Sequence, residues 1–524
     1  MNKGAGLLDA KGQPLRAGAE AFVAGSRSHP DLRRWDPVAG SPDADLNPEL
    51  GVIRSRSRDL ARNHGVADGA RQTMHDNVVG SGLRLSAKPS WKILGKDRKW
   101  AEEWGNQVEA FWKTWWDGIG VDAAECRTGD GLTSQMWNSA FLNGEGLALP
   151  LWLPDRGRRF STCLQVIEPD RLSNPNGEPD SETLRNGVEI DAYGRKLAFW
   201  IRTAHPGDLF YGPRFFGSLG TGVGKWERIP ARTDWGRVRI IHCPADEDRI
   251  GQSRGKPAIA SVMRQFKVLG DFTNAELKAA IVNAMVALVT ESSIGQEGLV
   301  ELLSSNPDAL SNYQNALASR KSASLDFTGG RIIPLQLGEK ISSFSPERPS
   351  SNFDAFVTTL FRHIATGLHI PYELLMKDFS KTNYSSARAS LLEAWRFFRG
   401  RRKWLVDYWL KPVYRLWLEE AINTGLIEAP DFYENADAWC ACRWIGDGRG
   451  WVDPLKEAEA AALRMDSNLA TLESECAEQG EDWEEVLEQR ARELKRIKEL
   501  ESEYGIRFPV KMTKPVPADP VPQD

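Results

Sequence analysis

Cysteine is scarce in this sequence, and the few cysteines lie far apart. There are six in 524 residues, at Cys126, Cys163, Cys243, Cys440, Cys442 and Cys476. Small secreted domains carry dense cysteine frameworks, and the first residues here do not read as a signal peptide. We therefore expect reduced thiols, no disulfides and a cytoplasmic setting. Cys440 and Cys442 lack a second Cys or His pair at zinc spacing, so packing is the favoured interpretation of both.

Long apolar runs and a strong excess of one charge are also absent. The longest apolar run, residues 279–289, contains Asn283 and has about half the length of a membrane span, which predicts a soluble chain with no membrane partner. The 67 basic and 72 acidic residues leave a net charge of −5. That balance argues against tight binding of DNA over an extended surface, because such binding needs many cations to neutralise phosphates.

No complete nucleotide-binding motif is present. Residues 220–225 (GTGVGK) resemble a phosphate-binding loop. However, Leu219 stands where the first Gly of that loop belongs, and Trp226 stands where the Ser or Thr that holds Mg²⁺ belongs. A turn between strands is therefore the favoured interpretation.

No complete catalytic motif is present either. Asp246, Glu247 and Asp248 could gather a metal ion for phosphodiester hydrolysis, yet three adjacent side chains cannot all point one way without special backbone geometry. A solvated loop is the favoured interpretation. His242 and Cys243 lie at an expected strand end without an obvious third partner. We expect no catalytic residue, no metal and no cofactor.

The chain has an ordinary globular composition and many tryptophans. Hydrophobic residues make up 41% and charged residues 27%, and 524 residues suggest about three or four domain-sized units. There are 20 tryptophans. Because tryptophan is enriched at protein interfaces, we expect part of this aromatic content to serve subunit contacts.

The hydrophobic pattern predicts an α+β fold. Residues 146–245 alternate short β-type runs with Gly and Pro turns, which predicts an antiparallel β-rich lobe. Residues 1–50 show little periodicity and are interpreted as an extended arm that folds onto a partner subunit. Helical spacing predicts the remaining main elements, which are helices over residues 54–80, 100–116, 132–142, 257–290, 455–478 and 481–503.

The most informative stretch is residues 361–417, in which two helical patterns flank a loop. A first helical stripe ends where Pro371 disfavours helical dihedrals at Ile370. Ser385 and Ser386 then offer cap oxygens to a second, longer helix. The apolar stripe of this second helix is Leu391, Trp395, Phe398, Leu405 and Trp409.

Two further features of the second helix stand out. Arg396, Arg399 and Lys403 fall on a separate face, for which an ordinary solvated basic face is the alternative to a functional one. Gly400 and Pro412 are residues at which a long helix can bend.

The string HIATGLHIPYELLMKDFSKTNYSSARASLLEAW (residues 363–395) strongly resembles the portal proteins of tailed bacteriophages, of the lambda-type group. The resemblance covers most of residues 50–505. Other strings also resemble these proteins. In chain order they are RSRDLARNHGVADGARQTMHDNVVGSGLRL (56–85), LNGEG (142–146), LQVIEPDRL (164–172), NGVEIDAYGRKLAFW (186–200), RIGQSRGKP (249–257) and WVDPLKEAEAAA (451–462).

This resemblance implies a portal fold, with a β-rich wing, two stem helices that flank a small α/β clip, a long bent helix and a helical crown. The implied segments, in chain order, are an arm (1–50), the wing (51–256), the first stem helix (257–290), the clip (291–350), the second stem helix (351–370), a tunnel loop (371–386), the long bent helix with its following segment (387–450), the crown (451–505) and a disordered tail (506–524).

The resemblance also implies a non-enzymatic ring, dodecameric in the family, at one vertex of a phage head. Such a ring is assembled in the host cytoplasm with scaffold and major capsid proteins and becomes part of the virion. It docks the terminase large subunit, conducts double-stranded DNA inward and later outward, and receives head-completion and tail adaptor proteins. A metal-dependent nuclease of the packaging apparatus that uses Asp246 and Asp248 is the alternative.

In a portal ring the tunnel loop is expected to contact DNA. Its two helices must turn their apolar stripes toward protein, so the polar side chains between them are left to face the channel. We expect contacts from Lys377 and Lys381, with Asn383 as a neutral contact, and few others, because each neutralised phosphate adds drag. The alternative is that both lysines pair with Glu373 and Asp378 on a solvated loop.

Overall fold

The computed structural model describes residues 22–27, 29–210, 225–245, 247–284, 287–292, 308, 311, 315, 339–344, 353–448, 450 and 453–507. The α-helices in this part are α1 (Pro42–Asn63), α2 (Gly65–Val78), α3 (Arg98–Trp116), α4 (Gly129–Asn143), α5 (Met263–Ala284), α8 (Phe353–Gly367), α9 (Tyr372–Met376), α10 (Tyr384–Leu405), α11 (Lys411–Asn423), α12 (Ala436–Trp439), α13 (Pro454–Asp466), α14 (Leu472–Glu478) and α15 (Trp483–Tyr504). The clip expected at 291–350, the GTGVGK stretch apart from Lys225 and the tail at 506–524 lie largely outside the described residues.

The strands form small antiparallel sheets, which agrees with the α+β prediction. They are β1 (Leu83–Ala87), β2 (Glu145–Trp152), β3 (Thr162–Ile167), β4 (Leu184–Arg185), β5 (Val188–Ile190), β6 (Lys196–Arg202), β7 (Trp226–Pro230), β8 (Ile241–Pro244), β9 (Ala287–Ser292), β10 (Glu339–Phe344) and β11 (Cys442–Gly446). Among the described strands, β3-β2-β8 and β4-β5-β6-β7 make the lobe expected at 146–245, β1 pairs with β11, and β9 pairs with β10.

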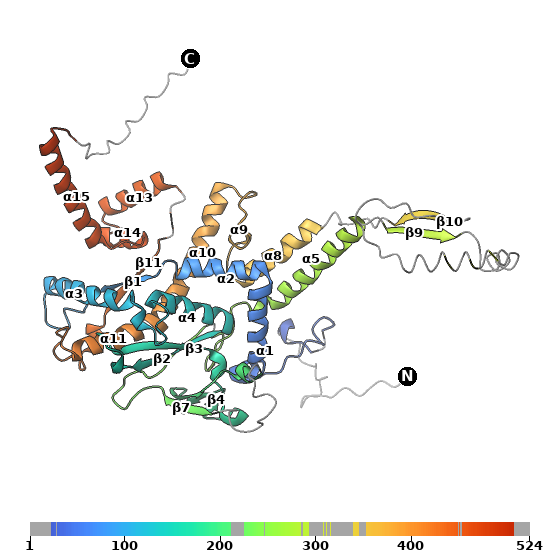
Figure 1. Cartoon of the computed structure of the whole chain (residues 1–524), viewed down its shortest axis with the longest axis horizontal. Helices are drawn as coiled ribbons and strands as arrows, with labels where there is room; N and C mark the ends of the chain where they lie inside the picture. The colour runs from blue at the N-terminus through green and yellow to red at the C-terminus, as the bar shows by residue number, and fades with distance from the viewer. Residues whose placement is uncertain are drawn as a thin grey trace, which may run out of the picture.

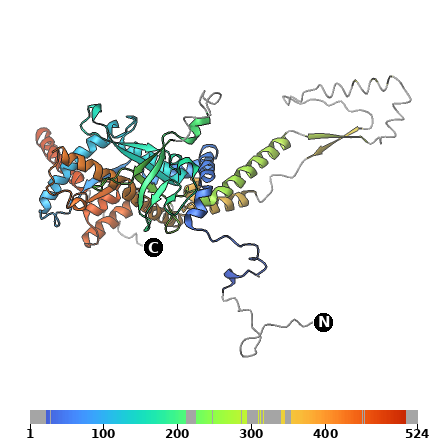
Figure 2. The same cartoon turned by 90° about the horizontal axis from the view of Figure 1, so that it is seen from below.

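A helical hairpin leaves the mixed body. Helices α5 and α8 run side by side away from the sheets, and the β9–β10 ribbon follows at their far end (Figures 1 and 2). Phe272 of α5 stacks on Phe353 of α8 with ring centroids 5.4 Å apart and meets Phe356 edge-on at 5.2 Å. These aromatic contacts join the two helices on one side.

The helix expected at 257–290 is shorter than its pattern suggested. A 3-10 turn at Ala260–Val262 precedes α5, which ends at Ala284, and residues 287–292 form β9 instead of the last helical turns. Strand β9 pairs along its whole length with β10, from Ala287 opposite Phe344 to Ser292 opposite Glu339. Pairing with a distant segment therefore overrides the local helical spacing, and the predicted helical end was wrong.

The helix expected at 54–80 is two helices, and part of the expected arm is helical. Helix α1 begins at Pro42, because Ser41 caps it by accepting from the Ala44 amide at 3.2 Å and proline suits the first helical position. His64, in an extended conformation, separates α1 from α2. The extended arm therefore ends before residue 42 and not at residue 50.

The main hydrophobic core contains a cluster of tryptophans. Trp112 and Trp115 of α3 and Trp417 of α11 are buried, and the Trp112 ring lies 5.3 Å from that of Trp417 and 4.7 Å from that of Trp116. Such aromatic pairs add about 0.5–1.5 kcal/mol each beyond burial of their area. These tryptophans pack inside one chain and are core residues.

The long helix bends at a π-helical segment, Val406–Leu410, between α10 and α11. Pro412 has no N–H, so the carbonyl of Tyr408, four residues earlier, loses the donor that a continuous α-helix would provide. The Cys243 thiol donates to that carbonyl at 3.2 Å. The bend therefore belongs to Pro412. Gly400, the second residue at which a bend was expected, lies within α10.

Residues 453–507 form three helices, and not two. The segment expected as one helix over 455–478 breaks after Asp466, where Asn468 has a positive φ of 57°. Thr471 and Ser474 then form a capping box that starts α14. Asn468 and the capping box therefore mark a break between α13 and α14 that the apolar spacing did not show.

Candidate functional site

The segment between α8 and α10 is partly helical. After α8 the chain turns through His369, whose φ is 58°, and Pro371 stands at the N-cap of α9. Proline is favoured at helix starts, so Pro371 opens this short helix as well as ending the previous one. The loop expected at 371–386 is thereby reduced to residues 377–383, between α9 and α10.

Both lysines of this loop are exposed, and their contacts within the chain are few. Lys377 adopts a left-handed conformation with φ 54° and has no ion-pair partner in the described part of the chain. Lys381 reaches Asp354 of α8 at 3.9 Å, and both side chains are more than 80% exposed. An ion pair that exposed contributes little stability, so Lys381 can exchange this partner for another anion.

The loop carboxylates are held by neighbours other than the lysines. Asp378 accepts from the Ser380 amide at 3.0 Å, and the pKa of Asp378 is lowered mainly by hydrogen bonds from Ser380 and less by the charge of Lys381. Glu373 accepts from Thr382 at 3.4 Å. These bonds fix the loop backbone without consuming a lysine charge.

Asn383 is the N-cap of α10, a role that the sequence pattern did not predict. Its side-chain oxygen accepts from the Ser386 amide at 2.9 Å and caps α10, so the expectation that Ser385 or Ser386 forms the cap was wrong. An Asn three residues before a Ser at the start of a helical stripe is the signal that could have found it. Asn383 remains exposed beside the lysines.

Helix α10 and the turns after it present two faces. Of the apolar stripe, Phe398, Leu405 and Trp409 are buried, whereas Leu391 and Trp395 are half-buried in the single chain. Arg396 and Arg399 are exposed without an ion-pair partner within the described residues, and Lys403 pairs with Asp407.

Arg402 holds α10 to the body. Its guanidinium donates to the carbonyls of Asn77 and Val78 at 3.0 and 3.1 Å, which are the last carbonyls of α2, and to that of Asp447 at 3.0 Å. A cation at a helix C-terminus satisfies unpaired carbonyls and the helix dipole. The Arg402 guanidinium also lies over the Trp395 ring at 5.2 Å.

A buried charge network is centred on Glu145, the first residue of β2. The Glu145 carboxylate accepts from Arg254 Nε at 2.8 Å, from Arg54 Nη2 at 2.5 Å and from His242 Nε2 at 2.8 Å, and its side chain is fully buried. Burial acts to raise the pKa of Glu145, but the charges of Arg254 and Arg54 outweigh it, so the pKa is well below its ordinary value. Arg254 also donates to the Leu172 carbonyl at 2.9 Å.

His242 is held neutral in this network. Burial lowers its pKa to about 4, the nearby Lys196 charge adds to the effect, and Glu145 opposes it. Lys196 Nζ lies 3.2 Å from His242 Nδ1, so the ring accepts at Nδ1 and donates to Glu145 at Nε2. Sequence reasoning missed the network, although a charged residue at the start of an apolar strand, Glu145 before Gly146 and Leu147, was a visible signal.

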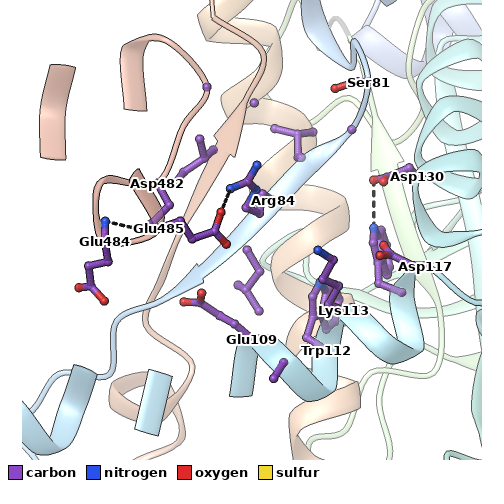
Figure 3. Close-up of a pocket in the computed structure, with 18 of the residues that line it drawn as sticks. Ser81, Arg84, Glu109, Trp112, Lys113, Asp117, Asp130, Asp482, Glu484 and Glu485 are labelled. Atoms are coloured by element: carbon purple, nitrogen blue, oxygen red, sulfur yellow. Dashed lines mark hydrogen bonds and ion pairs between the residues drawn. The ribbon is translucent and has the colours of Figure 1, made fainter. Parts of the chain in front are cut away.

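An acid-lined cavity of about 530 Å³ separates the start of α15 from the body (Figure 3). Glu109 of α3 lines it from one side and Asp482 and Glu484 line it from the other. Arg84 of β1 pairs with Glu485 at 2.7 Å across this space. Burial raises the pKa of Glu109 to about 7, so this carboxyl titrates near neutral pH.

The remaining candidates from the sequence do not assemble a reactive site within the described part of the chain. Asp246 lies outside that part, and Asp248 pairs with Lys256. Burial raises the pKa of Cys440 to about 12 and that of Cys442 to about 11, which disfavours the thiolate form that binds metal. Among the residues placed by the structure, no group of three or more His, Cys, Asp or Glu could hold a metal ion, and no helix could cross a membrane.

A helical hairpin, a cation-bearing loop beside α8 and a long bent helix on a β-rich body are the parts that the sequence resemblance implies for a phage portal protein. A family model described as phage portal protein, lambda family, matches residues 28–402. The chain belongs to the lambda family of phage portal proteins.

Individual relatives agree with this assignment. The chain is 33% identical over 495 residues to portal protein B of Escherichia phage lambda, a match that spans 91% of this chain and 90% of the relative. It is 33% identical over 478 residues to the portal protein of Escherichia phage N15, across 88% and 87% of the two chains. It is 23% identical over 465 residues to a probable portal protein of Halomonas phage phiHAP-1, across 88% and 83%.

Solved structures give weaker similarities. A chain from the neck of an empty GTA (gene transfer agent) particle matches with a TM-score of 0.40 and 14% identity, across 67% of this chain and 81% of the other. A chain from the neck of a native GTA particle, computed with C12 symmetry, matches with a TM-score of 0.38 and 12% identity, across 79% and 90%. Family membership therefore rests on the sequence matches.

Proposed function

We propose that twelve copies of this chain form a ring at one capsid vertex, through which double-stranded DNA enters the head and later leaves it. Membership of the lambda portal family is the observation that carries this proposal. The ring has no catalytic role, and the energy for DNA movement comes from the terminase that docks on it. Scaffold and major capsid proteins surround it during assembly in the host cytoplasm, and head-completion and tail adaptor proteins join the finished virion.

We assign the docking of the terminase large subunit, and later of the adaptor proteins, to the segment 291–350 between α5 and α8. The α5–α8 hairpin carries the ends of this segment away from the body (Figure 2). A segment presented at the end of a hairpin is accessible to successive partners, and exposed connecting segments commonly carry binding functions.

The tunnel loop, residues 377–383, is the proposed DNA contact. Lys377 and Lys381 are exposed and weakly paired, and symmetry turns each lysine into a ring of positive charge around the duplex. The contact spans few phosphates, and salt screens it within about 8–10 Å, so it acts on the movement and retention of DNA more than on equilibrium affinity. Asn383 contributes its amide nitrogen while its oxygen caps α10.

Charge reversal in the loop tests this role. Lys377→Glu with Lys381→Glu should leave ring assembly unchanged, because neither side chain is buried, while heads package less DNA or fail to retain it. DNA per head is measured by nuclease protection at low and high salt. Lys92→Glu with Lys99→Glu, two exposed lysines near the start of α3, is the matched control. Normal packaging and retention by the loop variant would rule out the loop as a DNA contact.

A further inference from the structure

Residues 454–507, the described part of the C-terminal segment, contribute no member to either hydrophobic core cluster. Helices α13, α14 and α15 have 13, 7 and 22 residues. Among the residues that the structure places, the main core has Trp439 as its last buried member and Trp444 as its last half-buried member. Short helices are marginally stable in water unless an apolar face packs against something.

Exposed ion pairs help to join this segment to the body. Arg84 pairs with Glu485 at 2.7 Å, Lys88 lies 3.9 Å from Glu473 and 3.8 Å from Glu484, and all but Glu484 are at least 40% exposed. Exposed ion pairs contribute about 0–1 kcal/mol each. They can orient the segment, but they cannot stabilise three helices.

One face of α13 is left uncovered in the single chain. Leu455, Glu459, Leu463 and Asp466 follow a spacing of four, four and three residues, which places them on one side of the helix. Leu455 is 65% exposed and Leu463 is 66% exposed. Glu459 and Asp466 are exposed and have no ion-pair partner within the described residues. We call these four residues the acidic face.

Helix α15 carries a face with the same spacing and the opposite charge. Leu487, Ala491, Lys495 and Lys498 again follow steps of four, four and three residues, and all four are exposed. Lys495 and Lys498 have no ion-pair partner in the part of the chain that the structure describes. We call these residues the basic face. Figure 1 shows α13 and α15 together at one end of the molecule.

We propose that the basic face of one copy packs on the acidic face of the next copy around the ring. Two acidic faces repel each other, as do two basic faces, whereas an acidic face attracts a basic face. The contact is therefore head-to-tail, the type that closes a ring. The leucines supply the apolar burial that the segment lacks within one chain. This inference rests on the proposed function, because it requires a ring of this chain.

Amide hydrogen exchange of residues 454–504 tests the contact. In purified wild-type rings, exchange in α13 and α15 should be about tenfold slower or more than in the monomer fraction separated by size exclusion. Ring formation is measured independently by light scattering. Rings in which α13 and α15 exchange as fast as in the monomer would overturn this inference and leave the proposed ring intact. Absence of rings would instead contradict the proposed function.

A mixing experiment identifies the occupant of each face. One variant carries Lys495→Glu and Lys498→Glu, and the other carries Glu459→Lys and Asp466→Lys. Each variant alone places like charges at every contact, so α13 and α15 should lose their protection. In a ring of alternating variants every contact joins opposite charges again, and an equimolar mixture assembled together should regain slow exchange.

The mixture distinguishes a contact between copies from a contact within one chain and from a contact with a different protein. If α13 and α15 paired within one chain, mixing could not repair either variant, and only the fourfold variant would recover. If a different protein covered these faces, neither the mixture nor the fourfold variant would differ from the single variants. Either result overturns the inference, and the wild-type rings serve as the reference for full protection.

Discussion

The carboxylate of Glu145 joins parts of the chain that are distant in sequence. Arg54 comes from α1, His242 from β8, and Arg254 from the segment before α5, and all converge on the start of β2. Two guanidinium groups and one carboxylate are tolerated in the interior because nearly every donor has an acceptor. The network fixes the packing of α1 against β2 and β8.

Removal of the central charge should be costly. Glu145→Gln leaves Arg54 and Arg254 buried without their counter-ion, and breaking a buried pair in this way costs about 3–5 kcal/mol. We expect a large fall in the thermal unfolding midpoint, measured by calorimetry. The control is Glu189→Gln, which removes the exposed pair with Arg228 and should cost under about 1 kcal/mol. Equal effects of the two variants would show that the network is not a stabilising centre.

His242 should make the stability of the protein depend on pH. In the unfolded chain it binds a proton below its ordinary pKa of 6.5, but in the folded chain burial lowers its pKa to about 4. Between these values the unfolded state binds more protons, so the free energy of unfolding falls as pH is lowered from 6.5 through 4, by about 3 kcal/mol.

The variant His242→Asn should have a flatter pH profile than the wild-type protein. Urea unfolding at pH 7 and pH 4.5 measures the free energy of unfolding of both proteins. Comparing the slope of this free energy with pH, and not its value at one pH, removes the separate effect of the lost Glu145 bond. The same slope in both proteins would mean that His242 is protonated in the folded state, contrary to its place beside Lys196.

At the scale of elements, the long helix is buried near Trp409 and more exposed near the tunnel loop, residues 377–383. Trp409 is fully buried in the π-helical turn, and its indole donates to Thr133 Oγ1 at 3.0 Å. Trp395, nearer the loop, is half-buried under the guanidinium of Arg402. The two ends of the stripe therefore differ in how much stability they contribute within one chain.

Alanine substitutions should reveal this gradient. Trp409→Ala leaves a cavity in the core and removes the indole bond to Thr133 Oγ1, and should cost about 3–5 kcal/mol. Trp395→Ala should cost less, about 1–3 kcal/mol, because its ring is only half-buried. Denaturant midpoints of the monomer fraction measure both effects. A Trp395 variant that is less stable than the Trp409 variant would contradict the burial found in the structure.

At the scale of the whole molecule, the chain offers surfaces that one copy does not cover. Leu277 and Ile281 on α5 are 60% and 50% exposed, in addition to the acidic and basic faces of α13 and α15. A monomeric protein rarely leaves several apolar surfaces open, so their number favours assembly into a larger particle.

The purified protein should therefore sediment and scatter as a closed ring. Twelve copies of a 58.5 kDa chain give a particle of about 700 kDa. Light scattering coupled to size exclusion at micromolar concentration measures this mass, and negative-stain images should show a central channel. A protein that remains a monomer or dimer under these conditions would contradict the portal ring.

The family, the α+β class and the presence of the main elements could be predicted from the sequence. Ordered strings such as residues 363–395 retain family identity, and helices such as α3 and α8 follow directly from apolar spacing, which is a local property of the chain. The three residues Lys377, Lys381 and Asn383 were selected because they lie between two helical stripes, and their contact with DNA remains a prediction.

Features that depend on distant partners became visible only in the folded chain. Strand β9 replaced the end of a helix because β10 pairs with it, and the tryptophans of α3 became core because α11 covers them. The sequence marks Glu145 as a charge at the start of an apolar strand, but its partners could not be predicted, because residues 54, 145, 242 and 254 meet only after the sheets form. Local spacing records which residues share a face, whereas the fold determines what that face meets.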